Sequence, residues 1–134
     1  MRLIAKYSYL LMCAGALVLA FTGIGVFITG KAPMTRWGLM LHCAAAPAFA
    51  LGILLVALSW PANMRRNLSW AFFWLFLLSG CAAMLSGVLP MLPICGSDGQ
   101  HFLYLTHRYA GIVCAVALVI FTAGLFSRTE GKTS

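Results

Sequence analysis

The sequence predicts an all-α membrane protein, a bundle of four transmembrane helices with both termini in the cytoplasm. Hydrophobic residues fill 63% of its 134 positions and charged residues only 8%, whereas a soluble domain averages about 25% charged residues. Four apolar stretches each provide the ~20 residues that a helix needs to span a bilayer. The connections between the first three stretches are short, so consecutive helices run antiparallel and residues 1–134 form one four-helix domain.

The four helices are expected at approximately 7–29, 37–60, 68–89 and 102–126. The N-terminus resembles a signal peptide in having a basic start and an apolar core. That apolar core is longer than the roughly 7–15 residues of a signal peptide. No small-x-small cleavage site follows it, so we expect the first helix to be retained.

Proline and polar residues mark the helix ends. Pro61 follows the second stretch, and Pro90 and Pro93 follow the third, where a proline cannot continue a helix. Ser97 and Gln100 have the spacing of a capping box ahead of the fourth helix. Each apolar stretch is therefore bounded by residues that favour the end of a helix.

The distribution of cations gives the orientation. The side that holds both termini carries Arg2, Lys6, Arg65, Arg66, Arg128 and Lys132, and the other side carries Lys31, Arg36 and Arg108. Cytoplasmic loops are enriched in Lys and Arg, so six cations against three place both termini in the cytoplasm. Cations located between apolar runs indicate topology signals and lipid headgroup contacts rather than a nucleic-acid surface.

The five cysteines include neither a CxxC pair nor a CxxCH motif, which excludes covalently attached haem, a zinc finger and a disulfide scaffold. Cys95, in the third loop, is expected to be an unpaired thiol. The other four lie in apolar runs, where a cysteine behaves as a small hydrophobic residue.

Two histidines lie inside apolar runs. His42 follows Trp37 by five residues, and His107 follows Phe102 by five residues. The second and fourth helices start from the same side, so at 1.5 Å per residue both imidazoles are expected roughly 8 Å below one membrane surface. A titratable side chain inside a membrane helix is a functional-site hypothesis by default.

The helix faces beside both histidines carry small residues. Positions i+3 and i+4 share the face of residue i; they are Ala45 and Ala46 after His42, and Ala110 and Gly111 after His107. A flat macrocycle between two helices needs such clearance, and haem ligated by an imidazole from each side fits it. Small residues also allow membrane helices to pack closely, and this second explanation stays open, above all for Gly80 to Gly87 in the third helix.

Arginines lie near both candidate ligands. Arg108 adjoins His107 and Arg36 precedes His42 by six residues, so both are expected to bind the haem propionates through charge-assisted bonds. Lys31 in the first loop fits either a propionate contact or interfacial snorkelling. A structural zinc would need two further ligands. His101, six residues before His107, is expected to be exposed and on another face.

Three stretches together resemble the bacterial membrane b-type cytochromes, the four-helix cytochrome b subunits of hydrogenases, formate dehydrogenases and related respiratory complexes. They are RWGLMLHCAAAPAFALG (36–52), LSGVLPMLPICGSDGQH (85–101) and YLTHRYAG (104–111). The resemblance implies axial ligation of a b-type haem by His42 and His107. Many members hold two haems and need four ligating histidines. This chain has two in its membrane helices, so a single haem near the periplasmic side is expected.

The resemblance also implies a function, that of an electron-transfer subunit in the bacterial inner membrane rather than a stand-alone enzyme. Electrons would pass between the quinone pool and a partner redox protein, a periplasmic cytochrome or an iron–sulfur protein. One haem near one surface leaves most of the ~30 Å hydrocarbon core uncrossed, so the chain alone is not expected to conduct electrons across the membrane. The alternative is a haem-free structural or anchor subunit of a larger complex. A transporter or proton channel is disfavoured because the predicted helices hold no acidic residue.

Overall fold

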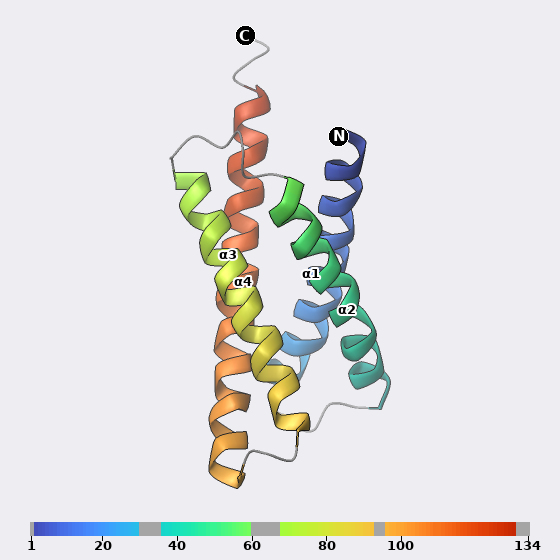
Figure 1. Ribbon diagram of the computed structural model, residues 1–134, viewed down its shortest axis with the longest axis vertical. Helices are drawn as coiled ribbons and strands as arrows, with labels where there is room; N and C mark the ends of the chain where they lie inside the picture. Colours follow the sequence, from blue (N-terminus) through green and yellow to red (C-terminus); the bar gives the residue numbers. More distant parts are fainter. Residues whose placement is uncertain (1, 30–35, 60–67, 93–95, 131–134) are drawn as a thin grey trace. The chain divides into compact units, whose positions relative to one another are not determined.

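The computed structural model describes residues 2–29, 36–59, 68–92 and 96–130. Within these ranges the chain forms four α-helices, which are α1 (Arg2–Thr29), α2 (Arg36–Ser59), α3 (Leu68–Val88) and α4 (Ser97–Glu130), and a short 3-10 helix, η2 (Leu89–Met91) (Figure 1). No strand occurs in them. Each of these α-helices is long and apolar enough to cross a membrane. The prediction of an all-α, multi-pass membrane protein is confirmed.

The predicted bounds of α2 and α3 agree with the structure to within one residue at each end. Two helices begin earlier than predicted, α1 at Arg2 rather than residue 7 and α4 at Ser97 rather than residue 102. The reason is that hydropathy locates the apolar part of a helix, whereas hydrogen bonding locates its first turn. In α4 that first turn is polar and exposed, with Asp98 near the positive end of the helix dipole.

The start of α4 also differs by one residue from the capping-box interpretation. The backbone N–H of Gln100 donates to the carbonyl of Gly96 at 3.0 Å. Gly96 is therefore the N-cap, and Ser97 is the first helical residue. At the other side of the loop, α3 ends at Val88 and Pro90 lies in η2, as expected of a residue that lacks the N–H needed to continue a helix. Pro61 and Pro93 lie outside the described residues.

The chain divides into two compact units, residues 1–63 and 64–134. Each is a helical hairpin, in which α1 packs against α2 and α3 packs against α4. We refer to them as the first and second hairpins.

In the first hairpin, two glycines bring the helix backbones into contact. A Cβ added to Gly52 of α2 would lie 2.7 Å from the Cα of Met12, and one added to Gly15 of α1 would lie 3.0 Å from the Cα of Phe49. Met12 and Phe49 are themselves buried, together with Ile53. Small residues therefore serve close helix packing in this part of the chain.

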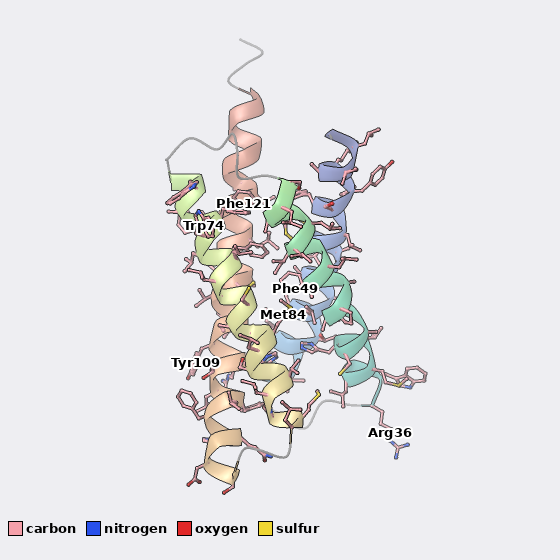
Figure 2. All side chains as sticks on the ribbon, in the orientation of Figure 1. Arg36, Phe49, Trp74, Met84, Tyr109 and Phe121 are labelled. Carbon is pink, nitrogen blue, oxygen red and sulfur yellow. The ribbon has the colours of Figure 1, made fainter. Side chains whose placement is uncertain are left out.

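The second hairpin has an aromatic core. The rings of Phe73 and Phe121 lie 5.6 Å apart between centroids, within the range of favourable aromatic pairs. The thiol of Cys114 donates to the carbonyl of Phe76 at 3.8 Å, which joins α4 to α3. Trp74, next to Phe73, is exposed on the outer side of α3 (Figure 2).

The remaining helix surfaces are apolar and suited to lipid. Only 11% to 28% of each membrane-spanning window is buried, and large hydrophobic side chains such as Phe21, Leu58 and Val119 are exposed. The hydroxyls of Ser59 and Ser79 donate to the carbonyl four residues earlier, each at 2.6 Å. Such bonds satisfy a hydroxyl where no water is present. These exposed faces have the composition of a surface that contacts a lipid bilayer.

Candidate functional site

His42 lies in the second turn of α2 and interacts with α1. Its Nδ1 is 2.8 Å from the Oγ1 of Thr22. The same Oγ1 is 2.7 Å from the carbonyl oxygen of Val18, one turn earlier in α1. A carbonyl oxygen can only accept, so the single hydroxyl hydrogen of Thr22 is donated to Val18. The imidazole then donates its Nδ1–H to Thr22, and when the ring is neutral its lone pair is on Nε2.

His107 interacts in the same way with its own neighbour, α3. Its Nδ1 is 2.7 Å from the carbonyl oxygen of Ala83. Because that oxygen has no hydrogen to give, Nδ1 must be the donor. When the ring is neutral, its lone pair is therefore on Nε2, as for His42.

The approach of His107 to the α3 backbone depends on Gly87. A Cβ at this position would lie 2.9 Å from Nδ1 and 3.0 Å from Cε1 of the imidazole. Side-chain carbons essentially never approach other atoms that closely, so only glycine permits the bond to the Ala83 carbonyl. At Gly87 the small residue serves the packing of α4 on α3, because the group that fills the space is the imidazole of His107. Clearance for a haem stays a prediction.

Gly23 of α1 lies beside His42 but with more room. An added Cβ would be 3.8 Å from the imidazole Cε1, which is ordinary van der Waals contact. Gly23 is therefore not required sterically in the way that Gly87 is.

The small residues predicted beside the two histidines are all half-buried: Ala45, Ala46, Ala110 and Gly111. A Cβ at Gly111 would meet no atom within 4 Å, so there is space at this position. One turn further along each of these helix faces, the side chain contacts the other helix of the same hairpin. Phe49 packs against Gly15 of α1, and Cys114 bonds to α3. The faces that carry His42 and His107 thus contribute to packing within their own hairpins.

The two arginines differ in their surroundings. Arg36 is the first residue of α2, and its exposed side chain points away from that helix (Figure 2). Arg108 is half-buried with its Nε atom buried, and its guanidinium carbon lies 5.9 Å from the centre of the Tyr109 ring, within cation–π range. Lys31 and Cys95 lie outside the described residues. His101 lies in α4 and is exposed, which confirms its expected exposure although not its placement ahead of the helix.

The two histidines alone are too few donors for a metal ion held by protein side chains only. In the described part of the chain, no group of three or more His, Cys, Asp or Glu side chains could hold a metal ion. Haem iron already has four ligands from its macrocycle and takes one or two axial ligands from the protein, of which histidine is a common one. Each of the two imidazoles has its Nδ1 within hydrogen-bond distance of an oxygen, 2.8 Å for His42 and 2.7 Å for His107.

Sequence reasoning found both histidines but missed what holds them. Thr22 is a hydroxyl residue in an apolar stretch of α1, seven residues before its end at Thr29, and His42 is six residues after the start of α2. In an antiparallel hairpin these positions lie at one level, so Thr22 could have been found. The Ala83 carbonyl could not, because every residue of α3 carries one.

Comparison of the chain with protein-family models, with curated proteins and with solved structures gives no match. The case for a function therefore rests on the two histidines and their surroundings.

Proposed function

We propose that this protein is a membrane electron-transfer subunit that binds one b-type haem through His42 and His107. The observation that carries the proposal is that both imidazoles present Nδ1–H to an oxygen of a neighbouring helix, 2.8 Å away for His42 and 2.7 Å for His107. Metal-ligating histidines almost always donate their second ring N–H in this way, which fixes the tautomer and the ring orientation. Haem, when bound, supplies reversible one-electron chemistry at iron.

The surroundings of the histidines support the same proposal. Two imidazoles in membrane helices are costly to retain without a function. Small side chains at Ala46 and Gly111 leave room beside the ligands for a rigid ring, and Arg36 and Arg108 would hold its propionates. Because Arg108 is half-buried and next to His107, it is the stronger of the two propionate partners.

The proposed subunit lies in the bacterial inner membrane with both termini in the cytoplasm and its haem near the periplasmic side. Electrons would pass between quinone and a periplasmic cytochrome or iron–sulfur protein within a larger respiratory complex. The orientation is tested with a membrane-impermeant thiol reagent, since Cys95 is the cysteine outside the predicted spans. Labelling of Cys95 from the periplasm is expected, and labelling from the cytoplasm alone would reverse the orientation.

The haem assignment is tested by the reduced-minus-oxidised visible spectrum of the purified protein. The wild type should show a sharp band of a b-type haem. His42→Ala and His107→Ala should each abolish or severely lower haem content, since each removes one of the two residues that would hold the iron. His101→Ala should leave the spectrum unchanged because that side chain is exposed. Haem lost with His101→Ala and kept in the other two variants would refute the ligand assignment.

A haem-free anchor subunit is the second candidate, and the close packing at Gly15 and Gly52 favours it. In that case the small residues would serve helix contacts throughout the chain, and the histidines would be interhelical hydrogen-bond donors. A colourless wild-type protein that is still needed for assembly of its complex would decide for the anchor.

A further inference from the structure

We propose that Thr22 is a positioning residue for His42, whose hydroxyl holds the imidazole in the Nδ1–H tautomer with the lone pair on Nε2. The inference rests on the proposed function, because the ligand role of His42 belongs to it. What it adds is a second residue, on another helix, that decides whether His42 can coordinate iron.

The direction of the hydrogen bonds that run from His42 through Thr22 to the α1 backbone follows from their last acceptor, which is a backbone carbonyl. Val18 and Leu19 offer carbonyl oxygens 2.7 Å and 3.2 Å from the Thr22 Oγ1. Both can only accept, and they compete for the one hydroxyl hydrogen. The hydroxyl therefore presents a lone pair, not a hydrogen, to the Nδ1 of His42. Successive bonds from Nδ1–H to Oγ1 and from Oγ1–H to the backbone polarise and strengthen each other.

The two histidines differ in how securely their tautomer is fixed. The acceptor for His107 is the backbone carbonyl of Ala83, which no side-chain substitution at that position removes. The acceptor for His42 is a hydroxyl, which can donate as well as accept. If Thr22 donated to Nδ1, the imidazole hydrogen would move to Nε2, and that nitrogen could no longer coordinate a metal. His42 is thus the ligand that depends on a single side chain.

Loss of the Thr22 hydroxyl should have two effects. Without an oxygen that holds Nδ1–H, the ring orientation is no longer fixed, and loss of such an outer partner typically lowers metal affinity about 10- to 100-fold. The bond also makes the imidazole a stronger electron donor, which favours oxidised iron. Its loss should therefore raise the midpoint potential.

The test compares Thr22→Val with Thr22→Ser in the full chain. Valine keeps the shape of threonine and removes the hydroxyl, whereas serine restores it. The matched control is Thr106→Val, because the Thr106 hydroxyl makes the same type of bond to the carbonyl four residues earlier, that of Phe102 at 2.9 Å. Thr106 is also adjacent in sequence to His107. Haemin is titrated into the detergent-solubilised apo-protein, and the midpoint potential and the low-spin ferric EPR spectrum are recorded.

The inference predicts that Thr22→Val binds haemin about tenfold or more weakly, has a higher midpoint potential and has a changed EPR spectrum. Thr22→Ser should recover the wild-type values, and Thr106→Val should show none of these changes. Equal affinity, potential and EPR spectrum in Thr22→Val and the wild type would overturn it and leave the haem assignment intact. A wild-type chain that binds no haemin would overturn both. If Thr22→Val does not accumulate in membranes, Thr22→Ala replaces it in the comparison with Thr22→Ser.

Discussion

Gly87→Ala tests the contact on which the position of His107 depends. The added Cβ would lie 2.9 Å from the imidazole Nδ1, about half an ångström inside the 3.4 Å at which ordinary contact begins. The atom it meets belongs to a ring that is itself bonded to the Ala83 carbonyl at 2.7 Å. The imidazole must therefore retreat, and that bond lengthens to about 3.2 Å or breaks, which is the weak limit for an N–H···O bond.

Two free energies compete in this variant. Alanine is the better helix former, by up to about 1 kcal/mol. Against this, an imidazole N–H in a part-buried bond costs about 1–3 kcal/mol when it loses its acceptor. The second term is the larger, and it acts on the orientation of His107, whereas the first acts on the stability of α3. We expect the helix to persist and haem binding to weaken by about 1–2 kcal/mol, which is a factor of about 5–30.

The assay is titration of haemin into solubilised apo-protein, with circular dichroism to verify helix content. Gly23→Ala is the matched control, since it also adds a methyl beside a candidate ligand but at 3.8 Å from the Cε1 of His42. Gly23→Ala should bind haemin as the wild type does. Equal affinity of Gly87→Ala and the wild type, or equal losses in both alanine variants, would refute the steric argument.

Three further predictions concern packing, charge and clearance. Gly52→Ala should destabilise the first hairpin by about 1–3 kcal/mol in thermal unfolding, because the new Cβ would lie 2.7 Å from the backbone of Met12, whereas Gly25→Ala meets no atom within 4 Å and should not. Arg108→Gln should keep haem but lower its potential by a few tens of millivolts, from a charge term on the order of 1 kcal/mol at ~10 Å and a dielectric of ~20. An unchanged potential would place Arg108 away from the haem. Ala46→Leu and Gly111→Leu should lower haem content in inserted protein, and normal loading in both would assign these residues to helix packing.

The fold was predictable where hydropathy and helix boundaries coincide. For α2 and α3 the apolar stretch is nearly the whole helix, and its bounds were predicted to within one residue. In α4 the helix begins before the apolar stretch, because the turn from Ser97 to Gln100 is polar and yet helical. Counting from Phe102 places His107 by the start of the apolar stretch. Counting from Ser97 places it ten residues into the helix. The depth of His107 in the membrane therefore depends on the apolar start and remains a prediction.

The candidate ligands were predictable because a histidine is rare inside an apolar run. Their hydrogen-bond partners were not, because a partner depends on how two helices are rotated about their axes. The sequence shows Gly23 and Gly87 as equivalent small residues, yet one has 3.8 Å of clearance from its imidazole and the other would clash at 2.9 Å. That difference is set by helix crossing geometry. Residue type alone does not encode it.

The two hairpins place different acceptors at the Nδ1 of their histidines, a hydroxyl for His42 and a backbone carbonyl for His107. A histidine in a membrane helix that is to coordinate iron through Nε2 needs an acceptor for its Nδ1–H, and either a backbone oxygen or a hydroxyl can provide one. The backbone route needs a close approach, so the second hairpin requires Gly87 beside His107. In the first hairpin the acceptor is the side-chain hydroxyl of Thr22, which reaches His42 without a close approach of the imidazole to the backbone at Gly23. The bond to His42 therefore depends on Thr22. A carbonyl is always an acceptor and a hydroxyl is not. Of the two proposed ligands, His107 is therefore the one whose tautomer is fixed by the fold, and His42 is the one whose tautomer a single side-chain substitution can change.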